Sequence, residues 1–331
     1  MYDKVKFVLR QLPAGYNWRE VLERIHKDSY KCNDSGGWGY WRGYRINVKE
    51  HSVRFEASLP KCLHENNVCT LSLKEVESLI EEMSCDWGIP MEDAEVESLE
   101  FGYNFEMEKP PLMYIDKLRA PQDFISNQWN NRTSCTVYMD KGKMRLKFYD
   151  KTDDARQKKQ YPDFPLPEHL LRYEVTFENN LLERMFGRTL TAKDLWNKRV
   201  FWTLVAEWFG LYEEVEKLPC SYWNMDFNKL NNKKHFLYWC VCTLNERQNL
   251  PYYIKRSFIG RSNPRPNDRK LHQSIQRCIR EALKWGKDTF PADDLMLELN
   301  TKIEAYLIWL LEQSEDGMSV EEERRLFSTS V

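Results

Sequence analysis

The sequence reads VESLEFGYN at residues 96–104, RLKFYDK at 145–151 and RYEVTF at 172–177. Apolar and polar side chains alternate in each stretch, which predicts a strand with one face in the core and one polar face. If the three strands share a sheet, the polar face brings together the carboxylates of Glu100 and Glu174 and the hydroxyl of Tyr149. The same polar positions also carry cations, at Arg145, Lys147, Lys151 and Arg172.

The remaining sequence patterns divide the chain into two parts. Residues 5–9, VKFVL, predict a further strand, and Ser72 with Glu75 three residues later predicts the start of a helix. After about residue 180 most segments have helical periodicity. We therefore expect an α+β domain at residues 1–190, built on a central antiparallel sheet flanked by helices, and a mostly helical domain at residues 191–331.

Composition restricts the class of protein. The formal net charge is −2, so any nucleic-acid surface must come from local clustering of positive charge. No run of 18 or more apolar residues predicts a membrane span, and the charged start MYDKVKFVLRQLP does not resemble a signal peptide. The nine cysteines have no regular frame, which predicts reduced thiols in a cytoplasmic protein.

The polar sheet face suggests phosphodiester chemistry. The carboxylates of Glu100 and Glu174 can hold Mg²⁺ or Mn²⁺, which prefer oxygen ligands. The Tyr149 oxygen can attack a phosphate, while Lys147 and Lys151 either stabilise charge on that phosphate or lower the pKa of the phenol. The same pattern also describes a solvated sheet face, and a single strand tyrosine often only packs, so both alternatives stay open here.

Several stretches in order resemble the rolling-circle replication initiators of the filamentous-phage gene II type and their plasmid relatives. The resemblance covers about residues 1–190: Tyr2-Asp3-Lys4, then VRFEASLPKCLHENNV, VESLEFGYNF, RLKFYDKTDD and LLRYEVTFENNLLERMFG. The matching positions in these stretches are Asp3, Ser58, Lys61, Asn67, Glu100, Tyr149, Arg172 and Glu174. Family membership would imply metal-dependent nicking and rejoining of single-stranded origin DNA through a covalent 5′-phosphotyrosine, in a bacterial host.

The resemblance also implies a fold related to the nucleases that bind metal through a His-hydrophobe-His pair. None of the six histidines has that spacing, so Glu100 and Glu174 would replace the pair, with Asp3 as a third ligand. Glu56 and His64 are weaker candidates for completing this metal site. Tyr149 is the preferred nucleophile; Tyr173, which alternation places on the apolar face, and Tyr161 follow it.

Other positive and aromatic residues are candidates for DNA contact. Arg172 either orients Glu174 or binds the DNA backbone, and Lys61 and Arg145 are further candidates for backbone contact. In SGGWGYWRGYR, residues 35–45, Trp38, Trp41 and Arg42 suit base stacking, although the same aromatics would also serve as sheet core. Residues 252–287 hold ten Lys and Arg against two acids, and we expect Arg265 and Arg269 there to contact DNA, although the same charges would also form a solvated helix face balanced by the acidic stretch that follows.

The expected partner is single-stranded or supercoiled origin DNA, with no membrane and no small-molecule cofactor. No Gly-x-x-x-x-Gly-Lys-Ser/Thr run occurs, so strand separation would need a host helicase. Two other functions stay open: a non-catalytic DNA-binding replication regulator on the same fold, and a structural or protein-interaction module whose polar sheet face is solvated.

Overall fold

A computed structural model describes residues 1–313 except 26–30, 122–123, 131–134, 142–143, 159–164, 220–229, 248–249, 251–253, 255–265 and 291. The described chain is built on a ten-stranded sheet in which every paired neighbour is antiparallel. In sheet order the strands are β2 (Lys31–Asn33), β3 (Gly36–Trp41), β4 (Tyr44–Lys49), β5 (Ser52–Ser58), β1 (Tyr2–Leu9), β6 (Glu95–Glu106), β11 (Leu170–Glu178), β10 (Met144–Asp150), β9 (Cys135–Lys141) and β8 (Ile125–Asn130). A separate two-stranded sheet pairs β7 (Leu118–Arg119) with β12 (Glu216–Lys217).

Helices precede, separate and follow the strands, and several of them pack against the large sheet. They are α1 (Trp18–Ile25), α2 (Leu59–His64), α3 (Leu73–Trp87), α4 (Pro111–Ile115), α5 (Lys151–Gln157), α6 (Asn179–Phe186), α7 (Lys198–Glu214), α8 (Lys233–Arg247), α10 (Pro266–Thr289) and α11 (Asp294–Gln313), with short 3₁₀ helices at Met91–Asp93 and Ala192–Trp196. Helix α3 begins with the predicted signal, because Ser72 and Glu75 form a reciprocal capping box. The predicted α+β class with a large antiparallel sheet and a helical C-terminal region is confirmed.

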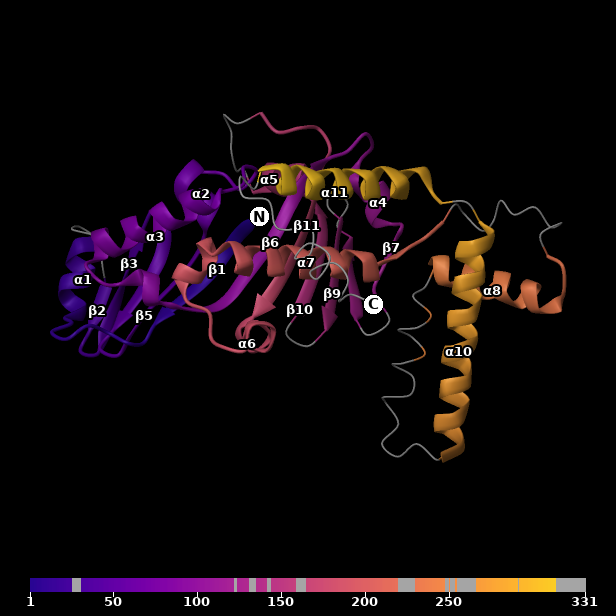
Figure 1. The fold of residues 1–331 in the computed structure, drawn as a ribbon, viewed down its shortest axis with the longest axis horizontal. Helices are drawn as coiled ribbons and strands as arrows, with labels where there is room; N and C mark the ends of the chain where they lie inside the picture. Colours follow the sequence, from indigo (N-terminus) through magenta and orange to yellow (C-terminus); the bar gives the residue numbers. More distant parts are fainter. Residues whose placement is uncertain are drawn as a thin grey trace.

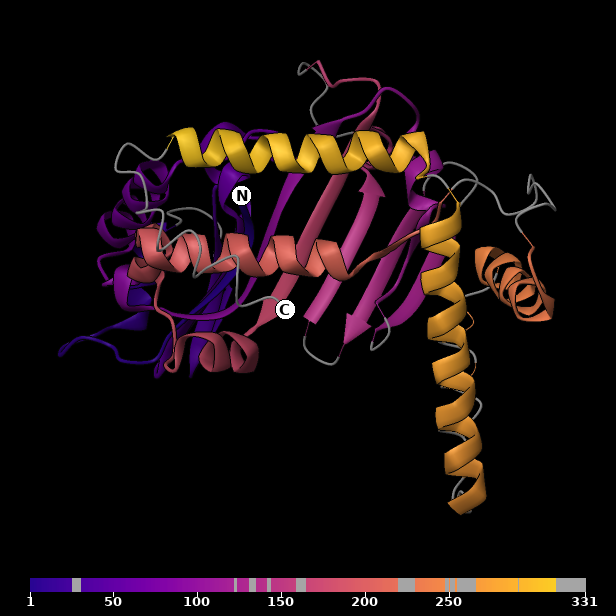
Figure 2. The same ribbon diagram turned by 45° about the vertical axis from the view of Figure 1, so that its right-hand side comes forward.

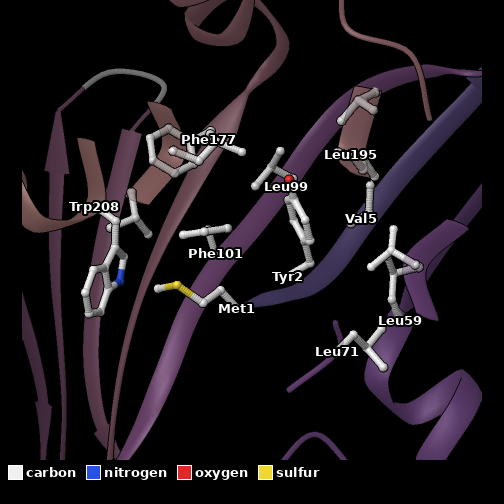
Figure 3. Close-up of a cluster of buried hydrophobic side chains, with 14 of the residues drawn as sticks. Met1, Tyr2, Val5, Leu59, Leu71, Leu99, Phe101, Phe177, Leu195 and Trp208 are labelled. Atoms are coloured by element: carbon white, nitrogen blue, oxygen red, sulfur yellow. The ribbon is translucent and has the colours of Figure 1, made fainter. Parts of the chain in front are cut away.

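One face of the sheet is apolar, and α7 and α11 cross it (Figures 1 and 2). The Tyr173 ring of β11 lies 4.9 Å from the Trp208 ring of α7, and the Tyr103 ring of β6 stacks 3.5 Å from that of Tyr306 in α11. Figure 3 shows Tyr2 and Phe101 of adjacent strands in the same cluster, with ring centroids 5.3 Å apart. These contacts bury the apolar side of each alternating strand.

The strand register places the predicted polar residues on the opposite face. Glu174 of β11 pairs with Lys147 of β10 on one side and with Gly102 of β6 on the other. Strand β1 lies between β5 and β6, so the beginning of the chain is a central strand beside β6. Residue 3 is therefore brought close to strands that follow it by about 100 to 170 positions.

Helices on both sides of residue 190 share the core of the sheet. Residues of α7 and α11, including Trp208, Leu299 and Ile303, belong to the same buried cluster as the strands. Helices α8 and α10 lie to one side (Figure 1) and pack on each other around a smaller cluster with Cys242 and Phe290. The domain boundary at residue 190 stays a prediction. The strands of the large sheet come before residue 190 in the sequence, whereas α7 and α11, which cover the apolar face of that sheet, come after it.

No helix among the described residues combines the length and the apolar character needed to cross a membrane.

The coverage of the sheet by α7 predicts a large cost for Trp208→Ala. Trp208 is fully buried, so its truncation leaves a cavity against Tyr173 and Phe105. We expect the free energy of unfolding to fall by about 3–5 kcal/mol in urea titrations. The control Ile308→Ala removes an exposed side chain of α11 and should cost less than about 1 kcal/mol. Equal, small effects for the two variants would contradict this packing.

Candidate functional site

Three carboxylates meet on the polar face of the central strands. Asp3 of β1, Glu100 of β6 and Glu174 of β11 each offer an oxygen, and these oxygens lie within 4.8 Å of one another. Asp3 and Glu174 are buried, and Glu100 is half-buried. We call these three residues the carboxylate triad. Its all-oxygen donor set fits a hard divalent cation such as Mg²⁺ or Mn²⁺.

Arg172 binds two members of the carboxylate triad. Its Nε donates to Glu174 Oε2 at 2.6 Å, and its Nη2 donates to Asp3 Oδ2. The remaining nitrogen, Nη1, donates to Asn104 Oδ1 at 3.0 Å and to the Asn67 carbonyl at 3.2 Å. The guanidinium is 3% exposed, so each of these charge-assisted bonds is shielded from water. Of the two roles predicted for Arg172, this geometry matches orientation of Glu174.

Asp3 also accepts hydrogen bonds from residues that precede and follow α2. The Ser58 hydroxyl donates to Asp3 Oδ1, and Asn67 Nδ2 donates to Asp3 Oδ2 at 2.9 Å. Asn104 of β6 fixes the segment after α2 by donating to the carbonyls of Asn67 and Val68, both at 3.1 Å. Ser58 and Asn67 matched the resembled family, and the structure brings both to Asp3.

Lys147 and Tyr149 of β10 complete the cluster. Lys147 Nζ lies 2.9 Å from Glu174 Oε1 and 4.1 Å from the centre of the Tyr149 ring. The Tyr149 hydroxyl donates to Glu174 Oε2 over a long 3.4 Å. The predicted alternation therefore brings Lys147, Tyr149 and Glu174 into direct contact.

The two glutamates of the carboxylate triad titrate in opposite directions. Burial, together with the negative charges of Glu174 and Asp3, raises the pKa of Glu100 to about 7. Burial also opposes ionisation of Glu174, but the charges of Lys147 and Arg172 outweigh it and hold the pKa of Glu174 at about 2. No Lys or Arg within the described ranges forms an ion pair with Glu100. Glu100 is thus the ligand with the most to gain from a bound cation.

Tyr149 is not activated in this arrangement. The side chain is 6% exposed, and burial with the nearby charge of Glu174 raises the pKa of its phenol well above the usual value. The phenol is therefore protonated at neutral pH. Tyr173, the second candidate, faces the apolar side and donates its hydroxyl to the Trp208 carbonyl at 3.0 Å. Tyr161 lies outside the described residues.

Lys151 and Lys61 lie near the carboxylate triad, although not where alternation put Lys151. The strand ends at Asp150, because the Asp150 carboxylate accepts from the Asp153 amide at 2.8 Å and caps α5. Lys151 is 1% exposed in the first turn of that helix, and burial with the charge of Arg172 lowers its pKa to about 8. Burial also lowers the pKa of Lys61 in α2.

For the aromatic residues of the β3–β4 hairpin, the sequence left two alternatives open, base stacking and packing in the sheet core. Trp41 is buried against Phe55 and Trp87, so it follows the packing alternative and does not present its ring for stacking. Arg42 donates to the Cys62 carbonyl at 2.7 Å and to Glu82. Trp38 is half-buried, with the Arg45 guanidinium 4.6 Å from its ring.

The other candidates lie away from the carboxylate triad. Arg145 is exposed and pairs with Asp140 at 2.6 Å. Glu56 pairs with Lys4, and His64 Nε2 lies 3.4 Å from Glu75, so neither belongs to the triad. Arg269 is exposed on α10, and Arg265 lies outside the described residues.

Sequence reasoning missed two features of the site, the close approach of β11 at Gly102 and the hydrogen bonds of Asn104. Gly102 lies directly opposite Glu174, and an added Cβ would come 2.5 Å from the Tyr173 carbonyl oxygen and 2.6 Å from Glu174 Cβ. A glycine inside a strand pattern is the available signal for such a close approach. Asn104 had no assigned role, because an amide on a polar strand face is usually solvated.

No protein-family model matches the chain, and no curated protein matches it.

The raised pKa of Glu100 predicts a pH-dependent effect of Glu100→Gln. In the folded chain Glu100 keeps a proton between about pH 4.5 and 7 that the unfolded chain has lost, so wild-type stability falls as the pH rises through this window. We expect Glu100→Gln to match the wild type near pH 4.5 and to exceed it by about 2 kcal/mol at pH 8 in denaturant titrations.

A matched control and a metal arm sharpen this test. Glu97 lies on the same strand, and its ion pairs with Lys6 and Arg10 outweigh burial and lower its pKa, so Glu97→Gln should lose up to about 1 kcal/mol at pH 8. Millimolar Mg²⁺ or Mn²⁺ should stabilise the wild type and Glu97→Gln more than Glu100→Gln. Equal responses in all three proteins would argue against Glu100 as a ligand.

Proposed function

We propose that the chain is a rolling-circle replication initiator that nicks and rejoins single-stranded origin DNA. The observation that carries this proposal is the direct contact of a tyrosine hydroxyl with a triad of carboxylates on one sheet face, Tyr149 to Glu174 at 3.4 Å. A nucleophile beside a hard-cation site is the combination that phosphodiester transfer needs. The ordered resemblance of residues 1–190 to the gene II type initiators supports the same reaction.

The proposed step forms one bond and breaks another. The Tyr149 oxygen bonds to phosphorus, the bond from phosphorus to the 3′ oxygen breaks, and the 3′ oxygen takes up a proton. The phenol proton leaves to solvent, because Glu174, with a pKa of about 2, stays ionised, and the 3′ oxygen takes its proton from solvent in turn. Rejoining reverses this: a 3′ hydroxyl gives its proton to solvent and bonds to phosphorus, the bond from phosphorus to the Tyr149 oxygen breaks, and that oxygen takes up a proton from solvent.

The surrounding residues have distinct roles in this proposal. Asp3, Glu100 and Glu174 would hold Mg²⁺ or Mn²⁺, which would supply charge stabilisation at the scissile phosphate. Lys147, 4.1 Å from the Tyr149 ring centre, stabilises the phenolate as the proton leaves. Arg172 positions Asp3 and Glu174 and does not touch the DNA. Lys61 offers positive charge to the phosphates that flank the cut, while Lys151, which is buried, adds positive charge near the site without contacting the DNA.

A non-catalytic DNA-binding regulator is the second candidate. The burial and raised pKa of Tyr149 favour it, as do the ion pairs that Arg172 and Lys147 already form with the triad. In that case DNA would bind the polar sheet face without cleavage.

A denaturing-gel adduct assay separates the two functions. The protein is incubated with Mn²⁺ and labelled single-stranded oligonucleotides that tile the putative origin of the element encoding it. We expect a metal-dependent covalent band that Tyr149→Phe abolishes and that Glu100→Gln weakens at least about tenfold, a typical loss on removing one electrostatic contributor. Tyr138→Phe is the matched control, because Tyr138 also lies beside Lys147, with its ring centre 5.8 Å from Nζ, but does not touch the triad.

The remaining outcomes are informative as well. A band that survives Tyr149→Phe keeps the nicking function and moves the nucleophile, with the Tyr173→Phe and Tyr161→Phe variants as the next test. Tight DNA binding without any band on any origin fragment would support the regulator instead.

A further inference from the structure

Helix α10 carries a second, separate cluster of positive charge. Its 24 residues contain six Lys or Arg against three acids, in a chain whose net charge is −2. All six of these cations are exposed, and four of them, Arg269, Arg277, Arg280 and Lys284, follow one another along one side of the helix. At 3.6 residues per turn they fall within an arc of about 80° around the helix. We call these four residues the basic stripe.

The opposite side of α10 is already occupied by α8. The Trp285 ring stacks 5.3 Å from the ring of His235, and Cys242 Sγ contacts the Ala282 carbonyl at 3.2 Å. The acid nearest the basic stripe, Glu281, is shared between the two helices: it accepts from the Tyr238 hydroxyl at 2.6 Å, lies 3.6 Å from Lys234, and lies 4.0 Å from Arg277 of the stripe. The exposed cations of α10 therefore outnumber its acids by six to three, and Glu281 divides its charge between Arg277 and α8.

The ends of α10 differ in their surroundings. Lys287 continues the basic stripe toward the sheet, where its charge acts on the carboxyl of the half-buried Glu216. From there α10 extends away from the sheet (Figures 1 and 2), so the beginning of the helix lies away from the strands that carry the carboxylate triad. The stripe spans about 22 Å at 1.5 Å per residue, which matches about six to seven base pairs of duplex at 3.4 Å each.

We infer that the basic stripe binds the phosphate backbone of duplex DNA without reading its sequence. Three of its four members are arginines, whose planar groups bind phosphate oxygens in pairs. The one aromatic residue of α10, Trp285, faces α8, so the stripe lacks the stacking platform that single strands use. A membrane surface fits less well, because Leu283 and Trp285 of α10 pack into the cluster shared with α8 and so leave Leu271 as the large exposed apolar side chain of the helix.

This inference extends the proposed function, because a nicked single strand continues into duplex on at least one side of an origin. The sheet would handle the strand that is cut, and α10 would hold the adjoining duplex. Duplex binding by the basic stripe does not itself require cleavage, so the two claims can fail separately.

Fluorescence anisotropy with the full chain and a labelled 30-base-pair duplex of random sequence tests the inference. The variant Arg269→Gln/Arg277→Gln/Arg280→Gln/Lys284→Gln should bind this duplex at least about tenfold more weakly. Its plot of log affinity against log salt should be less steep by about three to four units, the change expected when about four phosphate contacts are lost. Adduct formation on single-stranded oligonucleotides should stay at the wild-type level.

Two controls keep the test specific. The variant Arg19→Gln/Lys49→Gln/Lys109→Gln/Arg199→Gln removes the same charge from exposed positions elsewhere and should keep duplex affinity within about threefold. The variant Arg269→Lys/Arg277→Lys/Arg280→Lys keeps the charge and should retain most of the salt dependence.

The outcomes are distinct. Unchanged duplex affinity and salt dependence in the four-glutamine variant, or an equal loss in the charge-matched control, would overturn the inference. Loss of duplex binding in the four-glutamine variant alone supports it, even if no adduct forms in any protein, in which case only the nicking function fails.

Discussion

The ion pairs of one buried guanidinium connect the elements that form the candidate site. Arg172 joins β11 to β1 through Asp3, to its own strand through Glu174, and to β6 and the segment after α2 through Asn104 and Asn67. A buried charge without partners is strongly unfavourable, so Arg172 requires all of these groups to be in place together. The arrangement of Asp3 and Glu174 is therefore as definite as that of the core beneath them.

A gain in folding stability does not explain why Arg172, Asp3 and Glu174 are buried together as ions. Burying ions costs desolvation energy, and replacing a buried ion pair with apolar residues of similar size is often neutral or stabilising. Glu100 makes the cost larger, since it adds a third carboxylate with no ion-pair partner in the described part of the chain. Negative charge held against its own repulsion is typical of a site that meets a cation during function.

The sequence predicted the parts of the site that depend on local geometry. Side chains alternate strictly along a strand, so Glu100, Lys147, Tyr149 and Glu174 could be assigned to one face before any pairing was known. The position of β1 between β5 and β6 depends on long-range pairing, and only family resemblance suggested that Asp3 belongs with them. The end of β10 at Asp150 depends on a capping bond, and the burial of Trp41 depends on Trp87 in a later helix, so neither follows from alternation.

The central place of β1 also affects when the site can exist during synthesis. Asp3 leaves the ribosome well before its partners Arg172 and Glu174, which follow about 170 positions later, and the helices that cover the apolar face come later still. Pairings between residues so distant in sequence form slowly, because the entropy of closing a long loop is lost before the stabilising contacts form. A nascent or prematurely ended chain therefore carries a tyrosine and some carboxylates but no assembled carboxylate triad, so the site comes into being only once β11 has been made and paired.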